Sequence, residues 1–458
     1  MLSLEDNEVL CRVGPGTPMG DLMRQYWLPA VRADELPAPD CPPVRIKLLG
    51  EELIAFRTTS GAVGLIQNAC PHRGASLFFG RNEEEGLRCV YHGWKFDVTG
   101  ACVDMPSEPA ESNFRTKVRA RAYPCIERNG IIWAYMGPRE RDNLPPLPDI
   151  EANLLNRDPL KINVLMRACN WMQGIEGELD TVHAAFLHFG SAKLEDQAPG
   201  SFNFYHIKQR DGRFVVRDTD FGASYGCYRP AEDDTYYWRI AHVLFPFYAV
   251  PPQGALESKV QMNAYVPMDD EHTLQWEIFV NVEEAVRRGS FGTEMAGSTA
   301  REEQARTENQ ANRRPGSVYL PQSSGWYGRF RLDQDLSNDY MVDREAQRTG
   351  KSFSGIPGVR QQDMAVTETM GPIYNRTNEH LGTTDSMIIR ARRKWIATAR
   401  ALEEQGILPP GVDAPALYRQ RSGEVLLPRS VDWWAGTAEL RERFQGDDEK
   451  IADLVNSG

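Results

Sequence analysis

The segments Cys70-Pro71-His72 and Cys89-Val90-Tyr91-His92 decide how this sequence folds and what it binds. Sixteen residues separate His72 from Cys89. Each segment offers one thiolate and one imidazole, and a glycine follows closely in both. Two sulfur and two nitrogen ligands could hold a tetrahedral zinc ion. Zinc fingers, however, usually pair Cys with Cys and His with His, whereas one Cys and one His per loop suits a two-iron cluster whose irons have different ligands.

The sequence around these segments predicts a small all-β module. From Val44 to Gly137, short β-like runs alternate with turn signals such as Gly50-Glu51 and Asn129-Gly130. A charged connector with four prolines between residues 138 and 148 follows and indicates a linker. We therefore place a first domain at residues 1–150 and a second at residues 151–458.

The two segments together resemble the ligand motif of the Rieske family, in which two Cys hold one iron and two His hold the other. The resemblance implies that Cys70, His72, Cys89 and His92 bind a [2Fe-2S] cluster. Rieske subunits of respiratory chains usually add a disulfide-forming Cys to each loop, but here Ala75 and Tyr91 stand in those places. The motif is thus of the oxygenase and ferredoxin kind. We expect the remaining cysteines to be reduced or structural: Cys11, Cys41, Cys102, Cys125, Cys169 and Cys227.

A second candidate metal site lies in the roughly three hundred residues that extend beyond a ferredoxin's length. Asp180, His183 and His188 occur together there, and two His with one carboxylate are the ligands of non-haem Fe(II) in oxygenases. On a regular helix Asp180 and His183 lie about 60° apart, but His183 and His188 lie about 140° apart. The helix must therefore distort or end between the two histidines.

Downstream of a Rieske motif, this spacing resembles the iron site of ring-hydroxylating oxygenase α subunits. The resemblance implies an α+β chain: a Rieske domain, then a helix-grip (START-like) catalytic domain around an antiparallel sheet. It makes His183 and His188 iron ligands and Asp180 the carboxylate that bridges to a neighbouring subunit's Rieske histidine. The stretch 361–368 resembles the segment that supplies the third ligand, with Asp363 in the ligand place and Glu368 as runner-up.

The rest of the second half gives coarser predictions. Residues 170–188 are helix-like, 204–248 and 256–282 are β-rich, and 283–312 are charged, as in a surface helix or mobile excursion. Thr384 or Asp385 could cap a helix that runs to about Gln405, where Gly406 stops it.

The substrate is less well defined by the sequence. The segments around Asp339, Asp343, Gly371 and His380 resemble the phthalate dioxygenase branch, which acts on aromatic acids such as phthalates, phenoxybenzoates and methoxylated lignin acids. An acid needs a buried cation, and the candidates are Arg229, Arg239 and His242. We expect His206, His272 and His380 to be structural.

Four functions stay open at this point. The resemblance favours cis-dihydroxylation of an aromatic acid, with O-demethylation of a methoxylated acid as the main alternative. A Rieske electron carrier and a ligand-binding module without catalysis are the other two. The intact set Asp180, His183, His188 and Asp363 argues against the last one.

Composition and charge limit the partners. The net charge of −12 argues against nucleic acid or anionic lipid, and we expect a cytoplasmic enzyme without a secretory signal. No Gly-x-Gly-x-x-Gly fingerprint occurs, so NADH would deliver electrons through a separate flavin or iron-sulfur reductase. The family's long within-chain distance between metal centres implies a homotrimer or a hexamer made of two trimers.

Overall fold

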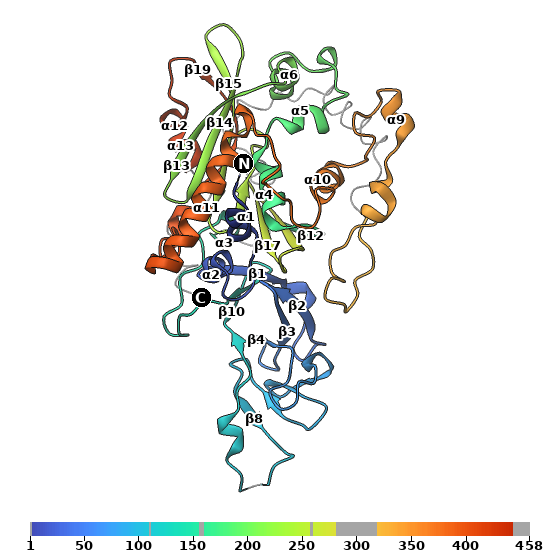
Figure 1. Cartoon of the computed structure of the whole chain (residues 1–458), viewed down its shortest axis with the longest axis vertical. Helices are drawn as coiled ribbons and strands as arrows, with labels where there is room; N and C mark the ends of the chain where they lie inside the picture. The colour runs from blue at the N-terminus through green and yellow to red at the C-terminus, as the bar shows by residue number, and fades with distance from the viewer. Residues whose placement is uncertain (1, 110, 155–159, 257–259, 281–317, 443–458) are drawn as a thin grey trace, which may run out of the picture.

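The computed structural model of the chain describes residues 2–109, 111–154, 160–256, 260–280 and 318–442. It has a narrow all-β part at the bottom of Figure 1 and a broader part above, built on a large sheet. Strands β1 to β11 form the all-β part, and the upper part combines its sheet with helices. The α+β class predicted from the sequence is therefore confirmed.

The all-β part contains three small antiparallel sheets. Their strand orders are β1-β11-β10, β2-β3-β4-β9 and β5-β6-β7-β8. The last of these is the tip that carries the Cys and His segments, one between β4 and β5 and the other between β6 and β7. The strands are β1 (Trp27–Arg32), β2 (Val44–Leu48), β3 (Glu51–Arg57), β4 (Val63–Gln67), β5 (Arg81–Glu83), β6 (Gly86–Arg88), β7 (Lys95–Phe96), β8 (Cys102–Asp104), β9 (Ala122–Tyr123), β10 (Cys125–Arg128) and β11 (Ile131–Tyr135).

The upper part is organised around an antiparallel sheet in the order β12-β18-β17-β16-β15-β14-β13, with β19 also paired to β15. These long strands are rich in aromatic and β-branched residues, which suit a half-buried pleated surface. The strands are β12 (Leu160–Arg167), β13 (Arg213–Thr219), β14 (Gly222–Pro230), β15 (Thr235–Leu244), β16 (Tyr248–Val250), β17 (Val260–Pro267), β18 (Thr273–Val280) and β19 (Gly423–Pro428).

Helices cover this sheet, as the helix-grip prediction requires. The longest, α11 (Ser386–Gln405), packs against β13 and β14 and ends at Gly406 in the left-handed conformation (φ +67°), as predicted. The other helices are α1 (Leu4–Cys11), α2 (Pro18–Arg24), α3 (Glu151–Leu154), α4 (Trp171–Leu179), α5 (His183–Leu187), α6 (Phe202–Lys208), α9 (Arg344–Arg348), α10 (Val359–Glu368), α12 (Trp433–Gly436) and α13 (Ala438–Arg441).

Two local predictions need comment. The β-rich stretch was expected to begin at Phe204, but residues Phe202–Lys208 form α6 because Ser201 caps the helix, its Oγ accepting the Phe204 N–H at 3.2 Å. The expectation for residues 283–312 lies outside the described residues. The first strand after α6, β13 of the large sheet, begins at Arg213.

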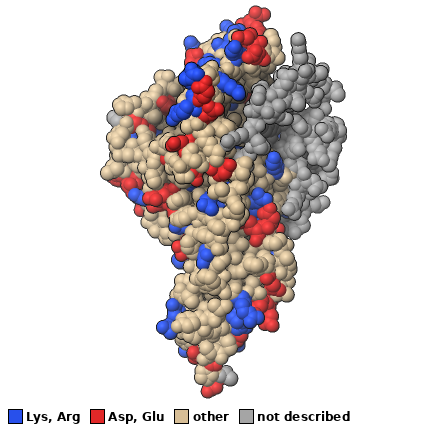
Figure 2. Space-filling view, turned by 90° about the vertical axis from the view of Figure 1, so that its right-hand side faces the viewer, with Lys and Arg blue, Asp and Glu red and all other residues tan. Residues whose placement is uncertain are grey.

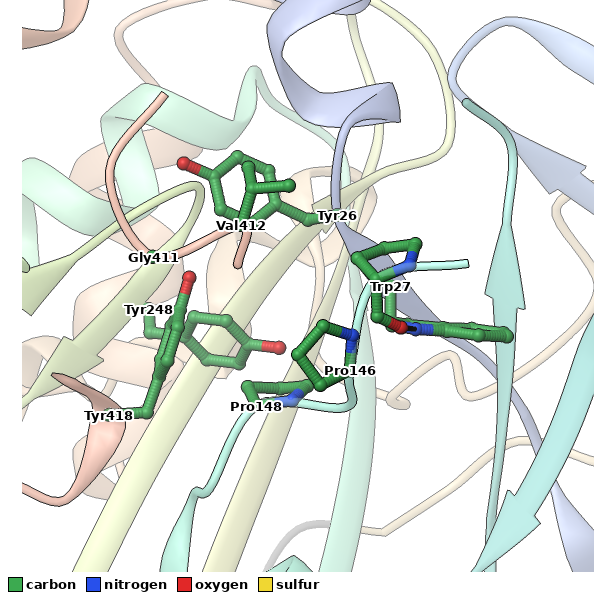
Figure 3. A pocket seen from close by; sticks show the side chains of 9 residues that line it. Tyr26, Trp27, Pro146, Pro148, Tyr248, Gly411, Val412 and Tyr418 are labelled. Carbon is green, nitrogen blue, oxygen red and sulfur yellow. Dashed lines mark hydrogen bonds between the residues drawn. The ribbon is translucent and has the colours of Figure 1, made fainter. Parts of the chain in front are cut away.

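The proline-rich connector packs into the junction of the two parts. Pro145, Pro146 and Pro148 line a small pocket together with Tyr248 and Tyr418 (Figure 3). The Trp27 indole N–H donates to the Pro145 carbonyl at 2.7 Å. No iron-ligand candidate lines this pocket, so we assign it to the domain junction and not to the chemistry.

A buried ion network fixes α4, the helix that leads into the candidate iron site. Arg376 donates to both carboxylate oxygens of Glu176 at 2.9 and 3.0 Å, and Arg392 of α11 donates at 2.6 Å. Burial alone would raise the pKa of Glu176, but the two arginines hold it below its usual value. The network therefore ties α4 to α11 and to the loop after α10.

We expect Glu176→Ala to lower the free energy of unfolding by about 3–5 kcal/mol, because it leaves the buried Arg376 without its carboxylate partner and Arg392 with Glu379 alone. Chemical denaturation followed by circular dichroism measures this. Glu8→Ala is the matched control, since Glu8 pairs with Arg12 at 2.7 Å on the surface, where the expected loss is below about 1 kcal/mol. Equal losses in the two variants would contradict the role given to the network.

The surface fits the charge analysis. On the described part of the face in Figure 2, acidic and basic side chains are interspersed, without an extended basic patch. Among the described residues, no helix combines the length and apolar character needed to cross a membrane.

Candidate metal centres and functional site

Two similar loops present the cluster ligands. The Cys70 N–H donates to the Ala75 carbonyl and the Cys89 N–H to the Trp94 carbonyl, both at 2.8 Å. In each loop the fourth residue after the Cys is a glycine with positive φ, Gly74 at +75° and Gly93 at +77°. The tight turns bring the two imidazole rings together, with the centroids of His72 and His92 4.4 Å apart.

The donor atoms of these loops fit a [2Fe-2S] cluster. The Nδ1 atoms of His72 and His92 are buried and have no hydrogen-bond partner among the described residues, as expected of atoms that bind metal. Cys70 and Cys89 are each 3% exposed, and burial raises the pKa of the Cys70 thiol to about 11. Such a thiol becomes a thiolate when a metal binds it.

The spacing of the four groups does not suit a single zinc ion. Ligands of one tetrahedral zinc, at about 2.0–2.3 Å from the metal, lie less than about 4 Å from one another. Among the described residues, the one set of three His, Cys, Asp or Glu ligand atoms within 4.8 Å of one another is elsewhere. The four cluster ligands are thus too widely spread for one ion, as two bridged irons require.

That set of three is His183, His188 and Asp363. The two Nε2 atoms are 3.1 Å apart, and Oδ1 of Asp363 lies 3.4 Å from His183 Nε2 and 3.2 Å from His188 Nε2. Adjacent ligands on one face of an octahedral ion, with bonds of about 2.1 Å, are about 3 Å apart. The three side chains are therefore arranged as a facial set for Fe(II).

The local fold explains how a 140° offset on a helix becomes a shared site. Helix α4 ends at Leu179, and α5 begins at His183 and ends at Leu187, just before His188. The regular helix thus ends between the two histidines, as predicted. Asp363 arrives from the middle of α10, and hydrogen bonds from the two histidines hold its pKa well below the usual range although burial alone would raise it.

The runner-up carboxylate is not part of this set. Glu368 is 3% exposed, and its Oε2 accepts a hydrogen bond from the Tyr340 hydroxyl. It lies more than one helical turn beyond Asp363 on α10. The geometry favours Asp363 as the third ligand.

A glutamine that the sequence analysis did not single out orients His188. The Gln362 Oε1 lies 2.7 Å from His188 Nδ1, and the Gln362 amide donates to the Ile356 carbonyl at 2.9 Å. Because Oε1 can only accept, the His188 proton sits on Nδ1, and Nε2 is left as the metal-facing lone pair. Adjacency to Asp363 was the only sequence signal for this role.

We expect Gln362→Leu to weaken Fe(II) binding by about 10- to 100-fold, since a lost partner of a metal-bound imidazole has effects of that size. Competition against a chromogenic chelator measures the affinity. Gln362→Glu keeps an acceptor at the same place and should retain most of it. A Leu variant that binds Fe(II) as tightly as wild type would show that the contact is incidental.

Asp180 lies at the end of α4, beside His183. Its Oδ1 accepts the backbone N–H of Val182 at 2.8 Å and of His183 at 3.2 Å. The second oxygen, Oδ2, is 3.9 Å from His183 Nδ1. The carboxylate thus both shapes the turn and places a negative charge behind an iron-ligand candidate, and it is 31% exposed.

The three predicted substrate residues do not lie together. Successive residues of a strand point to opposite faces, so Arg239 and His242 of β15 cannot share one. Asn263 of β17 donates to Glu178 of α4, so it lies on the face of the sheet that carries α4. Asn263 pairs with Ala249, and Ala249 pairs with Val243, so Val243 lies on that face too. Arg239 precedes Val243 by four residues on β15 and therefore points to the same face. Arg239 and His242 therefore cannot contact one substrate carboxylate together.

Two of the three substrate candidates, His242 and Arg229, already have hydrogen-bond partners within the protein. His242 is fully buried on the opposite face, between the Ser224 hydroxyl (2.7 Å) and the Arg421 carbonyl (2.9 Å). Arg229 is also fully buried and donates to the backbone carbonyls of Gln209 and Arg210. These contacts account for both side chains as parts of the scaffold.

Comparison with known proteins agrees with both centres. A model of the Rieske [2Fe-2S] domain matches residues 26–124, and a "LigXa C-terminal domain like" model matches residues 321–451. The oxygenase subunit of 3-chlorobenzoate-3,4-dioxygenase from Comamonas testosteroni is 45% identical, over 94% of this chain and 97% of that protein. The chain is a Rieske oxygenase α subunit.

Other members of the family differ in what they act on. The oxygenase subunit of phthalate 4,5-dioxygenase from Pseudomonas putida is 34% identical over 94% of each chain. That of 5,5'-dehydrodivanillate O-demethylase from a Sphingobium species is 31% identical over 97% of this chain and 93% of its own. Among solved structures, dicamba monooxygenase superposes with a TM-score of 0.51 at 17% identity, over 84% of this chain and 99% of its own, which supports the fold alone.

Membership of the family fixes the cofactor classes. A Rieske oxygenase carries a [2Fe-2S] cluster and a mononuclear iron, and both donor sets described above fit these groups. The zinc alternative for the first centre is thereby set aside.

Proposed function

We propose that this protein is the oxygenase component that cis-dihydroxylates an aromatic acid of the benzoate, phthalate or phenoxybenzoate type, using O2. The observation that carries the proposal is the facial set His183, His188 and Asp363, with ligand atoms 3.1–3.4 Å apart. A Rieske electron carrier has no use for such a set. The full-length similarity to the chlorobenzoate and phthalate dioxygenase subunits supports the substrate class.

Each metal group would be held by its own set of residues. Cys70, His72, Cys89 and His92 hold the cluster, and His183, His188 and Asp363 hold Fe(II). When bound, the cluster supplies an electron and the mononuclear iron supplies the site of O2 activation. A facial set would leave the opposite side of a bound ion free for O2 and substrate.

Electron delivery involves partners. We propose that a separate NADH-dependent flavin or iron-sulfur reductase reduces the cluster. Asp180 then bridges to a cluster histidine of the neighbouring subunit in a homotrimer or a pair of trimers. A carboxylate that accepts hydrogen bonds from two imidazoles can couple them, and Asp180 already has one imidazole within 3.9 Å and is 31% exposed. We also propose a cytoplasmic location.

O-demethylation of a methoxylated aromatic acid is the second candidate, because a 31% identical relative of nearly the same length is an O-demethylase subunit. Both reactions need the same metal sites. They differ in whether a ring carbon or a methoxy carbon faces the iron.

One screen tests the proposal. The protein, loaded with iron and supplied with NADH and a generic reductase, is offered 3-chlorobenzoate, phthalate, phenoxybenzoate and vanillate while O2 uptake is followed. A cis-diol product supports dihydroxylation, and formaldehyde with a free phenol supports demethylation. Two irons per chain in place of three, with no substrate-stimulated uptake, would point to an electron carrier.

A further inference from the structure

His206 on α6 has a ring nitrogen whose proton lacks an acceptor. Its Nδ1 lies 3.2 Å from a terminal nitrogen of Arg239. A guanidinium can only donate, so Nδ1 must be the acceptor and the imidazole proton must sit on Nε2. Nε2 is buried and has no hydrogen-bond partner among the described residues, and the whole residue is 1% exposed.

This arrangement is held in place by Arg239. The same terminal nitrogen donates to Glu424 at 2.8 Å, and the other donates to the Pro252 carbonyl at 3.0 Å. Arg239 is thus fixed by β19 and by the loop after β16, and it fixes the tautomer of His206 in turn. Burial, followed by the charges of Arg239, Arg229 and Arg210, lowers the pKa of His206 to about 2. The imidazole is therefore neutral, with one N–H to donate.

The ring of His206 is on the iron side of the sheet. Arg239 points to the face that carries α4, as the strand register shows. The ring of Phe189, which directly follows the iron-ligand candidate His188, lies 5.7 Å from the His206 ring in an edge-to-face contact. His183 is among the groups whose charge acts on His206.

Leaving this N–H without an acceptor has a cost. A buried donor without a partner destabilises a protein, and such a group in a native structure calls for an explanation, such as a bound water, an ion or a functional role. The charges of Arg239, Arg229 and Arg210 act on His206, and the carboxylate of Glu424 pairs with Arg239. The local potential thus favours an acceptor that carries negative charge.

We propose that His206 Nε2–H donates a hydrogen bond to the carboxylate of the aromatic substrate and so orients its ring beside the iron. The proposal rests on the function proposed above and identifies the residue that recognises the carboxylate of the substrate. It also changes the role of Arg239, which acts on the substrate through His206 and not by a bidentate contact of its own.

The test compares His206→Phe, which removes the donor and keeps a planar ring, with His206→Gln, which restores an N–H. We expect His206→Phe to raise the Kd for 3-chlorobenzoate and phthalate by about 10- to 100-fold and His206→Gln to recover much of that loss. Binding is measured by calorimetry on the iron-loaded, reduced protein. His380→Phe, the same change at an exposed position, should leave the Kd unchanged.

A second comparison changes the ligand. Wild type should bind 3-chlorobenzoate at least about 10-fold more tightly than 3-chlorotoluene, in which a methyl group replaces the acceptor. His206→Phe should lose most of this preference. It should also release more hydrogen peroxide per product formed, because the aromatic ring of the substrate is held less firmly.

The possible failures are distinguishable. If wild type binds and oxidises the acids but His206→Phe, with its full iron content, binds them equally well, the inference alone is wrong and a water completes the N–H. Equal affinity of wild type for 3-chlorobenzoate and 3-chlorotoluene would overturn it as well. If wild type binds none of the acids, the proposed substrate class is wrong, and this inference falls with it.

Discussion

Asp180→Asn is expected to leave both metal centres loaded and to lower turnover by at least about 100-fold. The substitution separates two roles of one side chain. The Oδ1 that accepts the N–H groups of Val182 and His183 is kept by Asn, so the turn between α4 and α5 should survive. The negative charge 3.9 Å behind His183 Nδ1 is lost, and with it the proposed coupling to the neighbouring subunit's cluster.

Single-turnover experiments give the clearest measurement. The cluster is reduced chemically, O2 and 3-chlorobenzoate are added, and reoxidation of the cluster is followed by its visible absorption while product is quantified. The variant should keep three irons per chain and a normal cluster spectrum but reoxidise slowly. Glu178→Gln is the matched control: Glu178 lies on the same helix and has the same change of charge, but Asn263 and Tyr265 of its own chain hold its carboxylate. Wild-type reoxidation in Asp180→Asn would rule out the bridge.

The sequence was sufficient to single out the candidate metal ligands, and the reason is physical. A cluster and an iron ion constrain residue type and spacing so tightly that Cys70, His72, Cys89 and His92 stand out against any background. The break in the helix before His188 followed from helix geometry alone. Helix α11 was predictable as well, because Gly406 ends it by a local rule.

The surroundings of the substrate candidates could be predicted only in part. His242 could have been separated from Arg239 by counting, since three residues along one strand reverse the face. His206, in contrast, was out of reach of the sequence. Its importance depends on Arg239 thirty-three residues away, which in turn depends on Glu424 a further 185 residues along the chain. No local pattern encodes an unpaired proton that only tertiary contacts create.

The second large effect is expected for Asp363→Ala, which should remove the mononuclear iron and abolish oxygenation. The variant lacks one of three ligands, and its two histidines, with Nε2 atoms 3.1 Å apart, would hold Fe(II) only weakly. Iron content should fall from three to two per chain. The visible spectrum of the cluster should not change, because its four ligands lie in the other domain.

Glu368→Ala on the same helix decides between the two carboxylates. Glu368 is buried against Tyr340 and lies outside the set of three ligand atoms. We expect this variant to lose some stability but to keep three irons per chain. Asp363→Asn adds a finer comparison, because an amide oxygen is a weaker ligand of the same shape and should leave iron partly bound. Retention of the third iron in Asp363→Ala, together with its loss in Glu368→Ala, would move the ligand assignment one turn along α10 and require the helix to shift on binding metal.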